Sequence, residues 1–178
     1  MRRMVWAIAL LFVCAAGASA QAVSVYVTSS SARFNNSPTG VAGQTTSFWT
    51  SGIGGGVLVN LVPAGPVRLG IDLRGSTKPG ATGADTAMGG IRLGISPPLL
   101  RIKPYLQASG GYLATRRNEL ETHYAAWEVL GGLDVPLVPF FDLRLIEVGG
   151  GSGRRLTNSS ATPNVSLFTV NTGLVFHF

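Results

Sequence analysis

Residues 67–74 read VRLGIDLR, with a branched apolar residue at every second position and a charged residue or glycine between them. The same alternation recurs at residues 91–95 (IRLGI) and 127–135 (WEVLGGLDV). It also runs through the C-terminal segment 168–178, FTVNTGLVFHF. A period of two over such lengths predicts β-strands whose two faces meet different solvents. The alternation therefore predicts an all-β chain.

Turn-forming residues divide the chain into eight strands. The predicted strands lie at 22–34, 47–61, 67–76, 85–95, 105–115, 122–135, 141–150 and 165–178. All ten prolines fall between them, as expected for a residue that cannot donate to an interior ladder. Three short connections alternate with four longer polar ones, FNNSPTGVAGQTTS, STKPGATGA, TRRNELET and GSGRRLTNSSATPN. This arrangement predicts an eight-stranded antiparallel up-and-down transmembrane β-barrel, with turns on one side and loops on the other.

The composition excludes several classes of protein. Charged residues make up 12% of the 178 residues, against about 25% in soluble domains. Disordered chains are polar and rich in charge, so disorder is excluded. The net charge of +6 is spread thinly along the chain, so we expect no nucleic-acid partner. The 24 glycines and 10 prolines disfavour helices.

The first twenty residues have the pattern of a cleaved signal peptide. Arg2 and Arg3 precede an apolar run at 5–16, and Ala18-Ser19-Ala20 is a cleavage site. The run is shorter than the roughly 20 residues that a membrane-spanning helix needs. We expect residues 1–20 to be removed and 21–178 to form one exported barrel domain. Cys14, the only cysteine, would leave with the peptide, which excludes disulfides.

The distribution of side chains over the two faces predicts that the apolar face points outward to lipid. The apolar face carries Val67, Leu69, Ile71, Leu73, Ile91, Leu93, Ile95, Leu106, Ala108, Tyr112, Trp127, Val129, Leu133, Val135, Phe168, Val170, Leu174, Phe176 and Phe178. A soluble, lipocalin-like barrel would have to enclose about twenty such side chains in a lumen that eight strands leave barely one side chain wide. Glycines share the polar face and leave room there for long side chains.

The polar face carries charges of both signs in equal number. They are Arg68, Arg74, Arg92 and Arg144 against Asp72, Glu128, Asp134 and Asp142. Because unpaired buried charge is costly, we expect these groups to form a salt-bridge network that plugs the lumen. The alternative is a gate in a narrow channel for ions or small solutes.

The C-terminal sequence GLVFHF resembles the last strand of outer-membrane barrels, with Leu174, Phe176 and Phe178 at alternate positions. The wider pattern resembles the eight-stranded OmpA-like and OmpX-like transmembrane barrels, and PFFDLRLIEV resembles the penultimate strand of small outer-membrane barrel domains. The resemblance implies an outer-membrane location. It also implies that periplasmic chaperones and the barrel-assembly machinery read the last strand. Cell-wall anchoring is not expected, because the sequence ends at Phe178.

The sequence gives little sign of catalysis, cofactors or metal. Some small barrels act on lipid A, but the deacylase pattern needs a serine two residues after a histidine. Ala125 has this position after His123, and the sequence has no residue at this position after His177. We place His123 at the end of the third long loop, where the predicted strand 122–135 begins, and His177 in the last strand, pointing inward. The glycine runs at 52–56 and 149–153 lack the Lys-Ser/Thr of a phosphate loop. A lipid A-modifying enzyme is the least favoured alternative, and no cofactor or metal is expected.

The predicted loops carry two pairs of adjacent arginines, Arg116-Arg117 and Arg154-Arg155. Guanidinium groups bind phosphates by charge-assisted hydrogen bonds, so these pairs are candidate contacts to lipopolysaccharide. The alternative is ordinary solvated loop charge. Otherwise we expect outer-membrane lipid as the surroundings and a monomeric protein.

One predicted strand breaks the alternation. Counting by twos from Phe141 sends Leu143 and Leu145 to lipid but also Glu147. A β-bulge near Leu145-Ile146 would send both of these apolar residues outward and turn Glu147 into the lumen. We therefore predict a bulge at this point.

Overall fold

The computed structural model describes residues 23–38, 45–64, 66–97, 101–117, 120–156 and 164–178. The predicted signal peptide at 1–20, with Cys14, lies outside the described residues. No helix in the described part of the chain is long and apolar enough to span a membrane.

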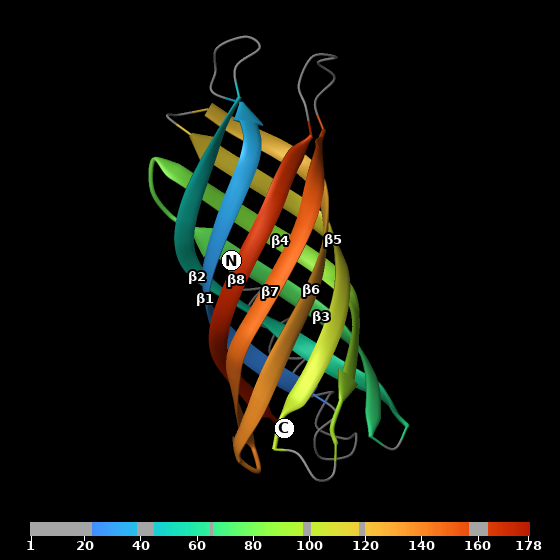
Figure 1. Ribbon diagram of the computed structural model, residues 1–178. Coiled ribbons are helices and arrows are strands. Elements are labelled where there is room, and N and C mark those ends of the chain that lie inside the picture. Colours follow the sequence, from blue (N-terminus) through green and yellow to red (C-terminus); the bar gives the residue numbers. More distant parts are fainter. Residues whose placement is uncertain (1–22, 39–44, 65, 98–100, 118–119, 157–163) are drawn as a thin grey trace, which may run out of the picture.

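Eight antiparallel strands form a closed barrel in sequence order, and β1 pairs with β8 to complete it (Figure 1). The strands are β1 (Val23–Pro38), β2 (Thr45–Ala64), β3 (Val67–Lys78), β4 (Thr82–Ile95), β5 (Lys103–Arg117), β6 (Leu120–Val138), β7 (Phe141–Arg155) and β8 (Val165–His177). The predicted fold class and strand order are confirmed. The C-terminus lies at one end, here called the C-terminal end, and the last residue of β1, Pro38, pairs with the first of β2, Thr45, at the opposite, far end.

Most strands extend beyond their predicted ends, and this shortens the connections. Two predicted long loops are largely strand, because β3 and β4 are joined by residues 79–81 alone and β5 and β6 by 118–119. Polar residues in these segments continue the ladder instead of leaving it. Four prolines fall inside the longer strands, Pro38, Pro63, Pro104 and Pro136. Each lies near a strand end or beside a register shift, the positions that proline tolerates.

The outward face is apolar, as predicted. Leu73 and Ile91 are each 61% exposed and Trp127 is 56% exposed, although all three lie in the middle of long strands. The charged residues that alternate with them, such as Asp72 and Arg92, are buried in the lumen. The predicted placement of apolar residues outside and charges inside is confirmed.

The predicted bulge in β7 is also confirmed. Arg144 pairs with Gly173 of β8, the next paired residue is Glu147 with Asn171, and Leu145 and Ile146 fall between them. Leu145 and Ile146 are both exposed, whereas Glu147 is buried. The extra residue thus restores the alternation and brings a carboxylate to the centre of the lumen.

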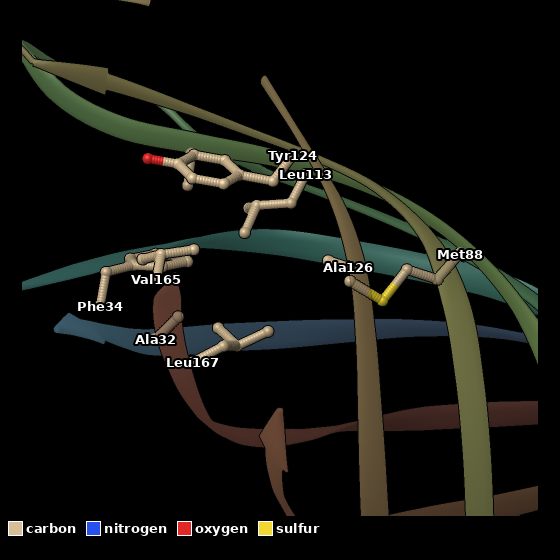
Figure 2. Close-up of a cluster of buried hydrophobic side chains, with 9 residues drawn as sticks. Ala32, Phe34, Met88, Leu113, Tyr124, Ala126, Val165 and Leu167 are labelled. Carbon is tan, nitrogen blue, oxygen red and sulfur yellow. The ribbon is translucent and has the colours of Figure 1, made fainter. Parts of the chain in front are cut away.

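The far half of the lumen contains an apolar cluster that was not predicted (Figure 2). It consists of Ala32, Phe34, Ala84, Met88, Leu113, Tyr124, Ala126, Val165 and Leu167, with Phe48 packed against it. The inward face was expected to be polar along its whole length. Eight of its nine buried members lie inside the predicted strands and only Ala84 lies beyond a predicted strand end, so the inward face changes from polar to apolar within the strands.

Candidate functional site in the lumen

The lumen outside the apolar cluster is filled by a central polar network. Its members are Tyr26, Asp72, Arg74, Arg92, Tyr105, Gln107, Glu128, Asp134, Arg144, Glu147 and Asn171. Two tyrosines fit into the narrow lumen because each faces a glycine across the ladder, Tyr26 opposite Gly56 and Tyr105 opposite Gly132. A side chain at either glycine would collide with the tyrosine ring or its hydroxyl group.

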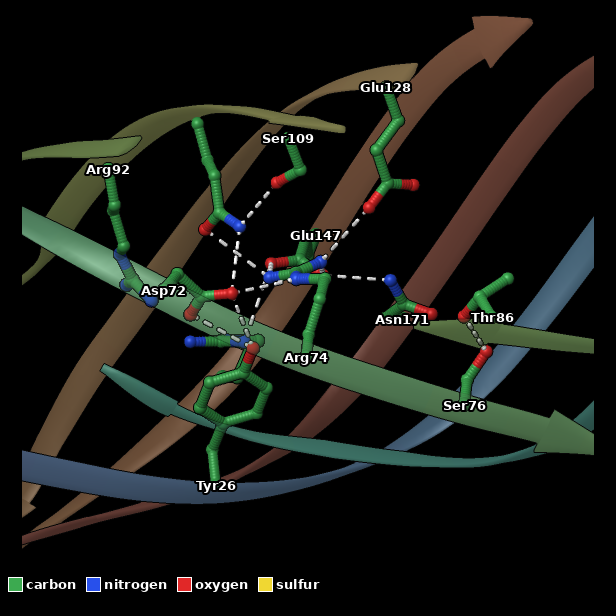
Figure 3. Close-up of polar contacts among 12 residues, drawn as sticks. Tyr26, Asp72, Arg74, Ser76, Thr86, Arg92, Ser109, Glu128, Glu147 and Asn171 are labelled. Carbon is green, nitrogen blue, oxygen red and sulfur yellow. Dashed lines mark hydrogen bonds and ion pairs between the residues drawn. The ribbon is translucent and has the colours of Figure 1, made fainter. Parts of the chain in front are cut away.

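Glu147 lies at the centre of this network (Figure 3). Its two carboxylate oxygens accept hydrogen bonds from Nη1 and Nη2 of Arg74, both at 3.0 Å. The Tyr105 hydroxyl donates to it at 2.6 Å and Nδ2 of Asn171 at 2.8 Å. Glu147 is 1% exposed, so water barely reaches its carboxylate. Residues of four strands meet at this group.

Arg74 joins this carboxylate to two others. Its Nε donates to Oδ1 of Asp72 at 3.0 Å, and its Nη1 lies 3.8 Å from Oε1 of Glu128. Asp72 also accepts from the Tyr26 hydroxyl and from Nε2 of Gln107. One guanidinium thus engages three carboxylates, a role suited to its planar fork of donors.

Asp134 lies on the C-terminal side of Glu147 and is held by two arginines. Nε of Arg144 donates to Oδ1 at 3.0 Å, and Nη2 of Arg92 donates to Oδ2. The guanidinium of Arg92 lies 3.4 Å from the centroid of the Tyr105 ring, and that of Arg144 lies 4.3 Å from the centroid of Tyr26. Each of these two guanidinium groups therefore lies over a tyrosine ring while its N–H groups bind Asp134.

A further ionic group lies near the C-terminal end. Nζ of Lys103 donates to Oδ2 of Asp142 at 2.7 Å, and Nε2 of His177 lies 2.8 Å from the same oxygen. Nδ1 of His177 is 2.8 Å from the Ser24 hydroxyl. His177 points inward, as the alternation predicted.

Seven of the eight predicted lumen charges enter these ion pairs, and Arg68 does not. Arg68 faces the lumen and lines a cavity at the C-terminal end, with no ion pair to another described residue. The predicted balance of four against four also omits the inward charges Lys78, Lys103 and Glu147, and nearer the far end Arg117 and Arg155. The bulge argument indicated Glu147, but the two lysines lay in segments assigned to connections.

A small polar cavity separates the central network from the apolar cluster. It has a volume of about 30 Å³, and its lining includes Ser76, Lys78, Glu128 and Thr169. Nζ of Lys78 donates to the Ser76 hydroxyl at 2.7 Å. A cavity of this size and polarity accommodates water. Along the barrel axis, the lumen is therefore filled by ion pairs, then a small wet space, then apolar side chains.

The four predicted lipopolysaccharide arginines do not lie together on the outside. They belong to β5 and β7 rather than to loops, and adjacent strand residues point to opposite faces. Arg116 faces outward and is bonded to Asp85, and Arg154 is exposed. Arg117 and Arg155 take the inward positions of their strands, so neither pair forms a two-arginine clamp. Arg33, a cation outside the two predicted pairs, also faces outward, and it pairs in register with Trp49 and Phe168.

The structure corrects the predicted place of His123 and assembles no metal site. His123 lies in β6, not in a loop, and its ring stacks on Tyr112 on the outer face with centroids 5.7 Å apart. Glu121 is 3.9 Å from its Nδ1. Within the described ranges, no three His, Cys, Asp or Glu side chains gather closely enough to hold a metal ion.

Solved structures with this barrel geometry are small bacterial outer-membrane proteins. Neisserial surface protein A matches with a TM-score of 0.61 at 16% identity, over 90% of this chain and all of that one. The N-terminal β-barrel domain of OprF from Pseudomonas aeruginosa matches with a TM-score of 0.54 at 11% identity, over 90% of this chain and 100% of that chain. The chain has the fold of a small outer-membrane barrel. No protein-family model and no curated protein sequence matches the chain.

Proposed function

We propose that the chain is an integral outer-membrane protein with a closed lumen, whose far end forms a surface for interactions outside the cell. The observation that carries this proposal is the length of the strands. They have 12 to 20 residues, whereas a strand needs about 9–11 to cross the membrane. The barrel wall therefore extends well beyond the apolar belt.

The extension is polar on its outer side. Its outward residues, here called the polar collar, are Arg33, Thr45, Ser47, Thr77, Asp85, Arg116, Glu121, His123 and Arg154. On β6 the change occurs between Trp127 and His123, and the strand from His123 to Leu120 adds about 13 Å on the polar side. In the proposed orientation the collar faces the exterior, and residues 1–20 act as the export signal. Arg33, Arg116 and Arg154 contact the phosphates of lipopolysaccharide.

The filled lumen favours this role over that of a channel. Glu147 and Arg144 are buried among ion pairs, and Phe34 and Leu113 occupy the lumen nearer the far end. A narrow channel for ions or small solutes is the alternative. We expect little or no steady conductance from the wild-type protein in a planar bilayer, and a large, stable pore would favour the channel instead.

Cysteine labelling in intact cells tests the orientation. Arg154→Cys lies in the polar collar and Arg101→Cys in the connection at the C-terminal end. We expect a membrane-impermeant maleimide to label the first in intact cells and the second only after lysis. The wild-type chain is the control, because its one cysteine is in the expected signal peptide. Labelling of Arg101→Cys alone in intact cells would reverse the orientation and refute the proposal.

A further inference from the structure

The C-terminal end of the lumen contains a second cavity, distinct from the small space beneath the apolar cluster. It has a volume of about 50 Å³, and its lining includes Ser24, Arg68, Arg92, Lys103, Asp142 and His177. The Lys103 side chain is 28% exposed, so the cavity can be reached from solvent. Its volume exceeds that of one water molecule several-fold.

The charges around this cavity do not balance. From the C-terminal end to Lys78, the inward cations of the described residues are Arg68, Arg74, Lys78, Arg92, Lys103 and Arg144, and the inward carboxylates are Asp72, Glu128, Asp134, Asp142 and Glu147. With His177 left out of the count, this stretch of the lumen thus carries one positive charge in excess. Every one of these carboxylates has a cation within 4 Å. Arg68 has no ion pair with any described residue, so the excess charge lies at this cavity.

Three buried polar atoms of residues that line the cavity have no hydrogen-bond partner among the described residues, and one of them, Nε2 of His177, lies 2.8 Å from Oδ2 of Asp142. Nη2 of Arg92 is paired with Asp134, but its Nη1 is buried with no acceptor among the described residues. Arg92 is only 7% exposed, so this donor is shielded from bulk water. Oδ2 of Asp142 is engaged by Lys103, but its Oδ1 is likewise buried with no donor among them. Leaving such groups unpaired costs free energy, so a ligand that satisfies both is favoured.

The complementary ligand has one negative charge, several acceptor oxygens and one hydroxyl group. A carboxylate or sulfate supplies acceptors but no donor for Oδ1 of Asp142. A singly charged phosphate group, which keeps at least one protonated oxygen, supplies both, and part of a phosphomonoester is in this form near neutral pH because its second pKa is about 6. Guanidinium groups are well suited to its remaining oxygens.

We propose that this cavity binds a phosphate group, either free phosphate or a small phosphomonoester, from the solution at the C-terminal end. Arg68 and Nη1 of Arg92 donate to phosphate oxygens, and Oδ1 of Asp142 accepts a hydrogen bond from the protonated oxygen. Lys103 lies beside the solvent-facing opening.

Titration of the detergent-folded barrel with inorganic phosphate tests the proposal, with binding followed by calorimetry and by ³¹P NMR. We expect saturable binding at constant ionic strength, and binding of sulfate and acetate at least about tenfold weaker. Arg68→Gln should weaken phosphate binding about tenfold, which corresponds to about 1.4 kcal/mol. The matched control Arg101→Gln removes an equal charge from an exposed position at the same end of the barrel, outside the cavity lining, and should leave the affinity unchanged. Phosphoethanolamine in a parallel titration shows whether a monoester is accepted as well as free phosphate.

Three results would overturn the proposal. They are the absence of saturable phosphate binding, equal affinity in Arg68→Gln and wild type, and binding of sulfate as tight as that of phosphate. If Arg68→Gln does not fold, Lys103→Gln tests the same site, because it removes a cation from the opening. We then expect weaker phosphate binding, and an unchanged affinity would count against the site.

Discussion

At the far end of the lumen, Phe34, Leu113 and Tyr124 pack together, whereas nearer the C-terminal end Glu147 is held by Arg74 and Arg144. Both regions fill the same narrow barrel with buried side chains. The apolar cluster is stabilised by contact area, and its members can shift without losing specific partners. The polar network depends on particular pairs, because a single missing partner leaves a buried charge uncompensated. The two regions should therefore respond differently to substitution.

Glu147→Ala should cause the largest loss of stability. It leaves Arg74 and Arg144 without their shared carboxylate in a region that water barely reaches, at a cost of about 3–5 kcal/mol. The free energy of unfolding in detergent, together with heat-modifiable gel migration, measures the effect. Glu121→Ala, an exposed carboxylate on the polar collar, is the control and should change stability by less than about 0.5 kcal/mol. Similar losses in both variants would show that the network contributes no more than surface charge.

Leu113→Ala should cost somewhat less, about 2–4 kcal/mol. Leu113 is fully buried in the apolar cluster, and truncation removes contact area and leaves a cavity. Leu156→Ala, at an exposed position beyond β7, serves as the control and should cost less than about 1 kcal/mol. A loss for Leu113→Ala as small as that of the control would mean that the cluster packs too loosely to stabilise the barrel.

Planar-bilayer conductance should rise strongly only when both the polar network and the apolar cluster are disrupted. Glu128 faces Arg74 and lies beside the small polar cavity, so Glu128→Ala enlarges the wet space beneath the apolar cluster. The apolar cluster still blocks the lumen beyond this space, so we expect only a small rise in planar-bilayer conductance. Glu128→Ala combined with Leu113→Ala should conduct several-fold more than either single variant. Full conductance in Glu128→Ala alone would assign the whole barrier to the polar network.

Deletion of Phe178 should change stability least, since this residue belongs to neither region. It is 68% exposed at the end of the last strand, and its backbone nitrogen donates to the carbonyl of Val23. We expect the detergent-folded barrel to stay within about 1 kcal/mol of wild type. The amount inserted in cells should fall several-fold if Leu174, Phe176 and Phe178 form the assembly signal. Equal insertion of both chains would exclude that role.

The outer face is the part of the molecule that the sequence described best. The alternation places Leu73, Ile91 and Trp127 outside because a strand's side chains must alternate whatever the other strands do. The same rule predicted the bulge in β7, because only an extra residue turns both Leu145 and Ile146 outward and Glu147 into the lumen. Local patterns of this kind need no knowledge of the partner strands.

Contacts across the lumen could not be predicted in this way. Alternation assigns Arg68 and Arg74 to the same face, but only strand tilt and register decide that Arg74 meets Glu147 of β7 while Arg68 forms no ion pair with a described carboxylate. The apolar cluster was missed for a related reason. All its members but Ala84 are inward residues of predicted strands, and they become a cluster only when the barrel closes.

By itself, the sequence determined the all-β class, the number of strands, the apolar exterior and the bulge, because each follows from the period of two along a single strand. Tertiary structure alone decided how far the strands extend, which charges pair, and where the lumen changes from polar to apolar. These properties depend on the stagger between neighbouring strands, which sets the height at which each inward side chain lies. Residues far apart in sequence, such as Arg74 and Glu147, therefore become partners only in the closed barrel.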